Sequence, residues 1–178
     1  MKPVLVDAET LRNLFAGLVE DTFQVELGVA DPSLTDYLSN LLVRFVRCDA
    51  IYRIRNATGQ RLYEVAEMLL EAEEREERPQ HEIHRHVGDF TLFWAGVFPE
   101  ALKRLQGAER KDHLLDYCQQ GKRAYYLAST CKEEPFRSQS ELLRRLSEEF
   151  ELCSFGLNRV RNEWEKLPRQ AGASPERN

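Results

Sequence analysis

The segment from Phe90 to Phe98 limits the possible folds of this chain more than any other, because almost none of its side chains is polar. Only Thr91 carries a polar group, and Gly96 has no side chain. A helix that is apolar around its whole circumference must be covered on every side. We therefore expect this segment to be the central helix of the protein or part of a subunit interface. Pro99 predicts a kink or the start of a new helix directly after it.

The C-terminal region predicts a long helix that packs along this centre. Ser138 and Glu141 match the S-x-x-E capping box that begins many helices. Apolar residues then recur at alternating steps of three and four, and they are Leu143, Leu146, Phe150, Cys153, Leu157, Val160 and Trp164. This seam spans only three heptads, which favours a partner helix within the chain over a dimeric coiled coil. Pro168 ends the pattern, and the polar tail over 169–178 is expected to be disordered.

Two amphipathic helices are predicted in the N-terminal part. The first begins at Asp7, whose side chain is a suitable helix cap. The second begins at Asp31, where Pro32 is suited to the first helical position because its missing N–H needs no partner there. Their apolar positions are Leu11, Leu14, Phe15, Leu18 and Val19, followed by Leu34, Tyr37, Leu38, Leu41, Leu42, Phe45 and Val46.

Further helices are expected in the middle of the chain. Asn56 to Gly59 is a turn signal, and we favour a helix-turn-helix around it, with a short β-hairpin over 51–65 as the alternative. Asp112 is a candidate cap for the helix that follows it, in which Gly121 and Ala128 are small enough to let a neighbouring helix approach closely.

The sequence therefore predicts an all-α fold. We expect a single-domain bundle of about five to seven helices over residues 1–168, which suits a chain of 178 residues with 42% hydrophobic and 31% charged side chains. The net charge of −5 disfavours non-specific binding to nucleic acid or to an anionic membrane.

Cysteine usage and hydropathy indicate a cytoplasmic protein. The four cysteines, Cys48, Cys118, Cys131 and Cys153, are far apart and contain no C-x-x-C pair, which disfavours a zinc site or a disulfide framework. No apolar stretch is long enough to cross a membrane.

Three of the four histidines lie within six residues, together with a carboxylate, and they are the strongest chemical signal in the chain. On one helix, His81 and His84 are about 60° apart and could share a divalent transition metal. His86 lies on another face, where Asp89 follows one turn later. An imidazole beside a carboxylate is suited to acid–base chemistry or to a structural link, so His84, His86 and Asp89 are the candidate catalytic residues.

A second cluster is basic. Between residues 44 and 61 the chain carries five arginines against one acidic residue, and they are Arg44, Arg47, Arg53, Arg55 and Arg61. Guanidinium groups bind phosphates and carboxylates through paired hydrogen bonds. These arginines are therefore candidates for binding an acidic ligand, or for pairing with the glutamates that follow them.

Three functions remain open. The first is a non-enzymatic interaction or regulatory module that binds a protein partner or associates with itself, because no complete catalytic motif is found. The second is a metal- or histidine-dependent enzyme centred on residues 81–89, and no other cofactor is predicted. The third is a nucleic-acid-binding or HEPN-like bundle that uses residues 44–61. The Arg–His spacing of HEPN ribonucleases occurs at Arg75–His81 and Arg78–His84, but Pro79 interrupts it, so the chain is not assigned to that family.

Overall fold

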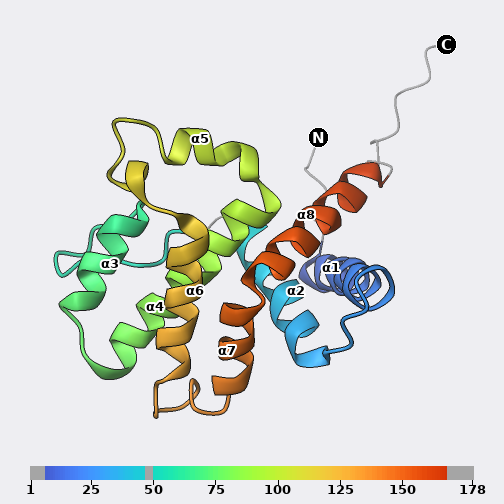
Figure 1. Cartoon of the computed structure of the whole chain (residues 1–178), viewed down its shortest axis with the longest axis horizontal. Helices are drawn as coiled ribbons and strands as arrows, with labels where there is room; N and C mark the ends of the chain where they lie inside the picture. Colours follow the sequence, from blue (N-terminus) through green and yellow to red (C-terminus); the bar gives the residue numbers. More distant parts are fainter. Residues whose placement is uncertain (1–6, 47–49, 168–178) are drawn as a thin grey trace.

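The computed structural model describes residues 7–46 and 50–167, and its regular secondary structure consists of helices joined by loops (Figure 1). Its α-helices are α1 (Ala8–Glu20), α2 (Pro32–Val46), α3 (Val65–Glu73), α4 (Glu77–Leu92), α5 (Leu102–Leu105), α6 (Tyr117–Ser129), α7 (Ser140–Glu148) and α8 (Phe150–Lys166). Short π-helices η1 (Asp21–Glu26) and η2 (Phe93–Val97) and 3₁₀-helices η3 (Pro99–Ala101) and η4 (Lys111–Leu114) join them. The predicted all-α fold is confirmed. Among the described helices, none is long and apolar enough to cross a membrane.

The apolar segment lies at the centre, as predicted, where it forms the end of α4 and the whole of η2. Phe90 and Phe93 are almost fully buried, whereas Trp94 and Phe98 are half-buried. α6 lies along α4, and α8 lies along η2 (Figure 1). The α4–α6 approach is close because Gly88 leaves room for the ring of Tyr125, which a Cβ atom at Gly88 would meet at 2.6 Å.

The C-terminal seam is buried but is divided between two helices. α7 and α8 are separated at Glu149, whose backbone angles of φ −103° and ψ 23° leave the helical range. All seam residues are buried except Trp164, which is half-buried. The predicted capping box is wrong, because Ser138 bonds to the side chain of Glu134 instead. α7 begins two residues later, at Ser140. The predicted disordered tail lies outside the described residues.

The other predicted helix starts have different outcomes. Asp31 caps α2, accepting a hydrogen bond of 3.3 Å from the N–H of Leu34. Asp7 precedes α1, but its side chain makes no capping bond. Pro99 is the first residue of η3, which leads into α5.

Residues 51–64 form an ordered loop, so the helix-turn-helix that we favoured is wrong before Val65. One isolated β-bridge joins Arg55 to Arg61, and no strand is formed among the described residues. The side chain of Asn56 organises the turn by accepting hydrogen bonds from the N–H groups of Thr58 and Gln60. Ile51, Ile54 and Leu62 are buried although the loop is not helical. Tertiary packing therefore overrides the helical spacing of its apolar residues.

Asp112 caps a helix far from it in the sequence rather than the one that follows it. Its carboxylate accepts hydrogen bonds from the N–H groups of Val65, at 2.9 Å, and Ala66, at 2.8 Å, in the first turn of α3. The cap of α6 is Asp116, which bonds the N–H of Gln119.

Candidate functional site

A buried carboxylate connects three helices at the centre of the molecule. Asp89 of α4 is 1% exposed. Its Oδ1 atom accepts hydrogen bonds from the hydroxyl of Tyr37 on α2, at 2.6 Å, and from that of Tyr125 on α6, at 2.7 Å. The guanidinium of Arg44, also on α2, donates to Oδ2 at 3.3 Å. The structure thus brings together two predicted site residues, Arg44 and Asp89, with Tyr37, which lies on the predicted apolar face of α2, and with Tyr125.

The hydroxyl groups in this cluster are held in their protonated form. Burial, and then the charge of Asp89, raise the pKa values of Tyr37 and Tyr125 well above the usual range. Both hydroxyls therefore remain hydrogen-bond donors, and both carboxylate oxygens are engaged. A buried carboxylate that is paired and fully hydrogen-bonded fixes the positions of the elements that contact it. The arrangement is suited to holding α2, α4 and α6 in register.

His86 points to a different partner from the one its spacing suggested. Its Nε2 atom lies 2.8 Å from the carbonyl oxygen of Ile51, and the described residues provide no hydrogen bond between His86 and Asp89. Burial lowers the pKa of His86 to about 4. The neutral ring packs between Phe45 and Phe90 and ties the loop after α2 to α4.

His81 and His84 share one face of α4, as predicted, with ring centroids 6.3 Å apart. The ring of His81 also contacts Phe136. Within residues 7–46 and 50–167, no group of three or more metal-ligating side chains is assembled. The pair therefore lacks a third protein ligand in the part of the chain described.

The basic stretch is divided rather than gathered into one patch. Arg44 lies against Asp89, Arg53 is exposed on the loop, and Arg47 lies outside the described residues. Arg55 donates to the carbonyl oxygen of Gly59 at 2.7 Å and sits across the β-bridge from Arg61.

The two Arg–His spacings are also explained by local pairs. Arg75 pairs with Glu71, and Arg78 pairs with Glu82, each at a spacing of four residues. The described cysteines, Cys118, Cys131 and Cys153, are free thiols, and Cys48 lies outside the described residues.

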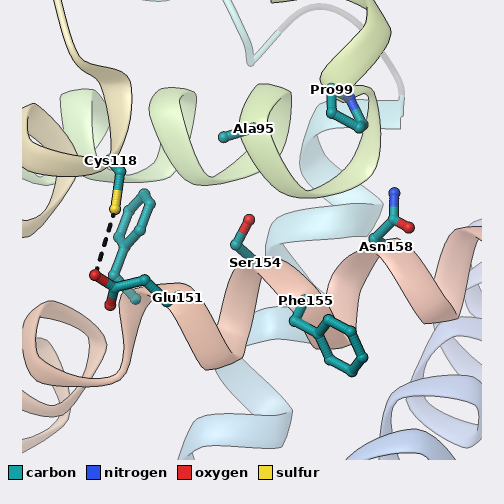
Figure 2. A pocket seen from close by; sticks show the side chains of 8 residues that line it. Ala95, Pro99, Cys118, Glu151, Ser154, Phe155 and Asn158 are labelled. Carbon is teal, nitrogen blue, oxygen red and sulfur yellow. Dashed lines mark hydrogen bonds between the residues drawn. The ribbon is translucent and has the colours of Figure 1, made fainter.

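A surface trough that the sequence reasoning missed runs between η2 and α8 (Figure 2). It has a volume of about 350 Å³. One wall consists of Ala95 and Pro99, and the other is a stripe along α8 made of Glu151, Ser154, Phe155 and Asn158. Phe155 is 54% exposed. The sequence did contain one indication of this trough. Phe155 is a large aromatic residue on α8 that does not belong to the buried seam.

The trough continues into a second depression of about 560 Å³, with which it shares Ala95 and Cys118. Leu114, at the edge of this depression, is 91% exposed. The two walls approach closely at Gly96, because a Cβ atom there would lie only 3.1 Å from the carbonyl oxygen of Ser154. Asn158 and Arg161 bond the carbonyl oxygens of Gly96 and Val97, which the helix end leaves free.

Comparison with known proteins identifies no relative. No protein family matches the chain, and no curated protein or solved structure is significantly similar to it.

Proposed function

We propose that this protein is a non-enzymatic interaction module that binds an amphipathic helix of a partner protein in the trough between η2 and α8. The observation that carries the proposal is the exposure of Phe155 and Leu114 along two adjoining depressions. Contiguous exposed apolar surface rimmed by polar side chains is typical of protein-binding sites. The trough has this character, with Glu151 and Asn158 at its border.

The shape of the trough supports a helical occupant. Its α8 wall presents residues 151, 154, 155 and 158, which form one ridge at helical spacing. η2 lies beside α8 and provides the second wall (Figure 2). A third helix packs well into the groove between two helices, because its side chains enter the spaces between their ridges.

The fate of the buried polar groups also supports a binding function. Asp89, His86 and Asp112 each bond within the fold and link separate elements. These three buried groups thus contribute to architecture, whereas Phe155 and Leu114 at the trough remain exposed.

Selection of peptides from a displayed library of amphipathic helices tests the proposal. We expect enriched peptides to carry apolar residues at helical spacing and to bind about tenfold less tightly to a Phe155→Ser variant, because an exposed aromatic contact is lost. Leu70→Ser is the matched control, since Leu70 is 64% exposed on α3, away from the trough. Equal binding to wild type and Phe155→Ser, or no enrichment, would refute the proposal.

Sedimentation equilibrium of the protein alone distinguishes a second copy from a foreign partner. We expect a monomer whose mass is unchanged by Phe155→Ser. A dimer that dissociates in this variant would show that the trough is occupied by another copy of the chain, and would overturn the assignment to a partner helix.

A further inference from the structure

A second cleft, which shares no lining residue with the trough, opens between α3, α4 and α6. Its volume is about 290 Å³, close to the lower limit for pockets that bind small molecules. The apolar part consists of Leu69, Ala124 and Leu127. Five polar side chains line the rest, and they are Glu73, Gln80, His84, Gln120 and Arg123. Such a mixture offers both an apolar contact and directional recognition.

One part of the cleft provides hydrogen-bond donors. Arg123 is exposed at the cleft and forms no ion pair with any described residue, so its guanidinium is available. The Nδ1 atom of His84 is buried and has no hydrogen-bond partner. We assign the proton of the neutral ring to Nε2, because a proton on Nδ1 would be a buried donor without an acceptor. Burial, His81 and Arg123 lower the pKa of His84 to about 4, which keeps the ring neutral near pH 7.

Another part of the cleft provides acceptors. Glu73 forms no ion pair with any described residue and lines the same cleft as Arg123. Gln80 donates its amide N–H to the carbonyl oxygen of Ala72 at 3.0 Å. This bond orients the Gln80 amide and leaves its oxygen as an acceptor.

From this juxtaposition of unpaired Arg123, neutral His84 and unpaired Glu73 around an apolar wall, we infer that the cleft binds a small zwitterion, an α-amino acid with an aliphatic side chain. Arg123 and the Nε2–H group of His84 bind its carboxylate. Glu73 and the oxygen of Gln80 bind its ammonium group, and the aliphatic side chain contacts Leu69 and Leu127. Charge-assisted hydrogen bonds at both ends make recognition depend on both charges.

Calorimetric titration of the full chain with free L-alanine, L-valine and L-leucine tests the inference. We expect at least one of them to bind, and N-acetylation or amidation of that ligand to weaken binding at least about tenfold, because each removes one charged partner. Arg123→Gln and Glu73→Gln should weaken binding by a similar factor. Arg104→Gln and Glu148→Gln are matched controls, because both residues are exposed and lie outside the cleft.

Each other outcome overturns the inference. Absence of binding at millimolar ligand, or equal binding by the cleft variants and wild type, would show that the cleft is not an amino-acid site. Equal binding of the N-acetylated ligand would show a site for simple carboxylates instead. Thermal melting of each variant confirms folding, and none of these results depends on occupation of the trough.

Discussion

Tyr125 and Tyr126 are neighbours in the chain, but α6 directs the first into the core and leaves the second 51% exposed. The hydroxyl of Tyr125 donates to the buried carboxylate of Asp89 at 2.7 Å. We expect Tyr125→Phe to lower the free energy of unfolding by about 1.5–3 kcal/mol, the usual contribution of a hydrogen bond to a charged group. Urea denaturation measures this change.

Tyr126→Phe is the matched control for this prediction, and its effect should be within about 0.5 kcal/mol because the hydroxyl is at the surface. Similar effects of the two substitutions would mean that the Asp89 cluster does not stabilise the fold. A Tyr37→Phe/Tyr125→Phe double variant should lose more than the sum of the single losses, because each single variant keeps one hydroxyl on Oδ1 whereas the double variant leaves that buried oxygen without a donor.

The buried ring of His86 makes stability depend on pH. Its pKa is lowered from 6.5 to about 4 in the folded protein, so between these values the unfolded chain binds more protons than the folded one. The free energy of unfolding is therefore independent of this group above pH 6.5. It falls as the pH decreases towards 4, by at most about 1.4 kcal/mol per pH unit for this group.

Urea denaturation at several pH values between 7 and 5 checks this slope. In His86→Gln the amide can still donate to the carbonyl oxygen of Ile51, but it does not take up a proton, so we expect a shallower dependence on pH. Some dependence should remain, because the pKa of His84 is also lowered to about 4. An unchanged slope in His86→Gln would contradict the role of this ring.

At the scale of the elements, α3 depends on a residue 47 positions away. Asp112 accepts two N–H groups of the first turn of α3 and the hydroxyl of Tyr117. We expect Asp112→Ala to lower the free energy of unfolding by about 2–3 kcal/mol, because it removes a cap and leaves buried donors unsatisfied. Hydrogen exchange should show lost protection in α3 and retained protection in α6.

Asp116→Ala provides the comparison, because Asp116 is a local cap of α6 at the surface. It should cost about 1 kcal/mol and affect only the first turn of α6. If α3 remains protected in Asp112→Ala, the long-range cap is not what stabilises that helix.

The sequence predicted the helices better than it predicted their caps. Apolar spacing located α2 and the seam of α7 and α8, because burial of one helical face dominates the energy of a helix in a protein. The apolar run over 90–98 located only the end of α4 and η2. Local capping signals failed at Ser138 and Asp112, where the tertiary fold brings other partners within reach. Sequence periodicity contains no information about a hydrogen bond between residues 47 positions apart.

For the candidate sites too, the sequence indicated individual residues but not their tertiary partners. Arg44 and Asp89 were chosen separately for their chemistry, but only the packing of α2 against α4 joins them. His86 was correctly expected to lie on a different face from His84, although its partner is a backbone carbonyl. The trough was missed because it depends on how far α8 stands from η2, which side-chain volumes along both elements determine.

At the scale of the whole molecule, the packing converges on Gly121. This glycine is buried on α6, and a Cβ atom there would overlap the hydroxyl of Thr91 on α4 and the ring of Phe150 on α8. Thr91 donates to the carbonyl oxygen of Val87 at 2.7 Å, so its hydroxyl cannot rotate away without losing that bond. Three elements are thus fixed by the absence of one methyl group.

Alanine at position 121 should therefore destabilise the fold, although alanine has a higher helix propensity than glycine. We expect Gly121→Ala to lower the free energy of unfolding by about 1–3 kcal/mol or more through overpacking. Gly17→Ala is the matched control, because Gly17 is exposed within α1 and a Cβ atom there meets nothing within 4 Å. That substitution should raise stability by about 0.5–1 kcal/mol through helix propensity alone. Urea denaturation of both variants measures the contrast, and a stabilising Gly121→Ala would mean that α4, α6 and α8 are farther apart in solution than this packing requires.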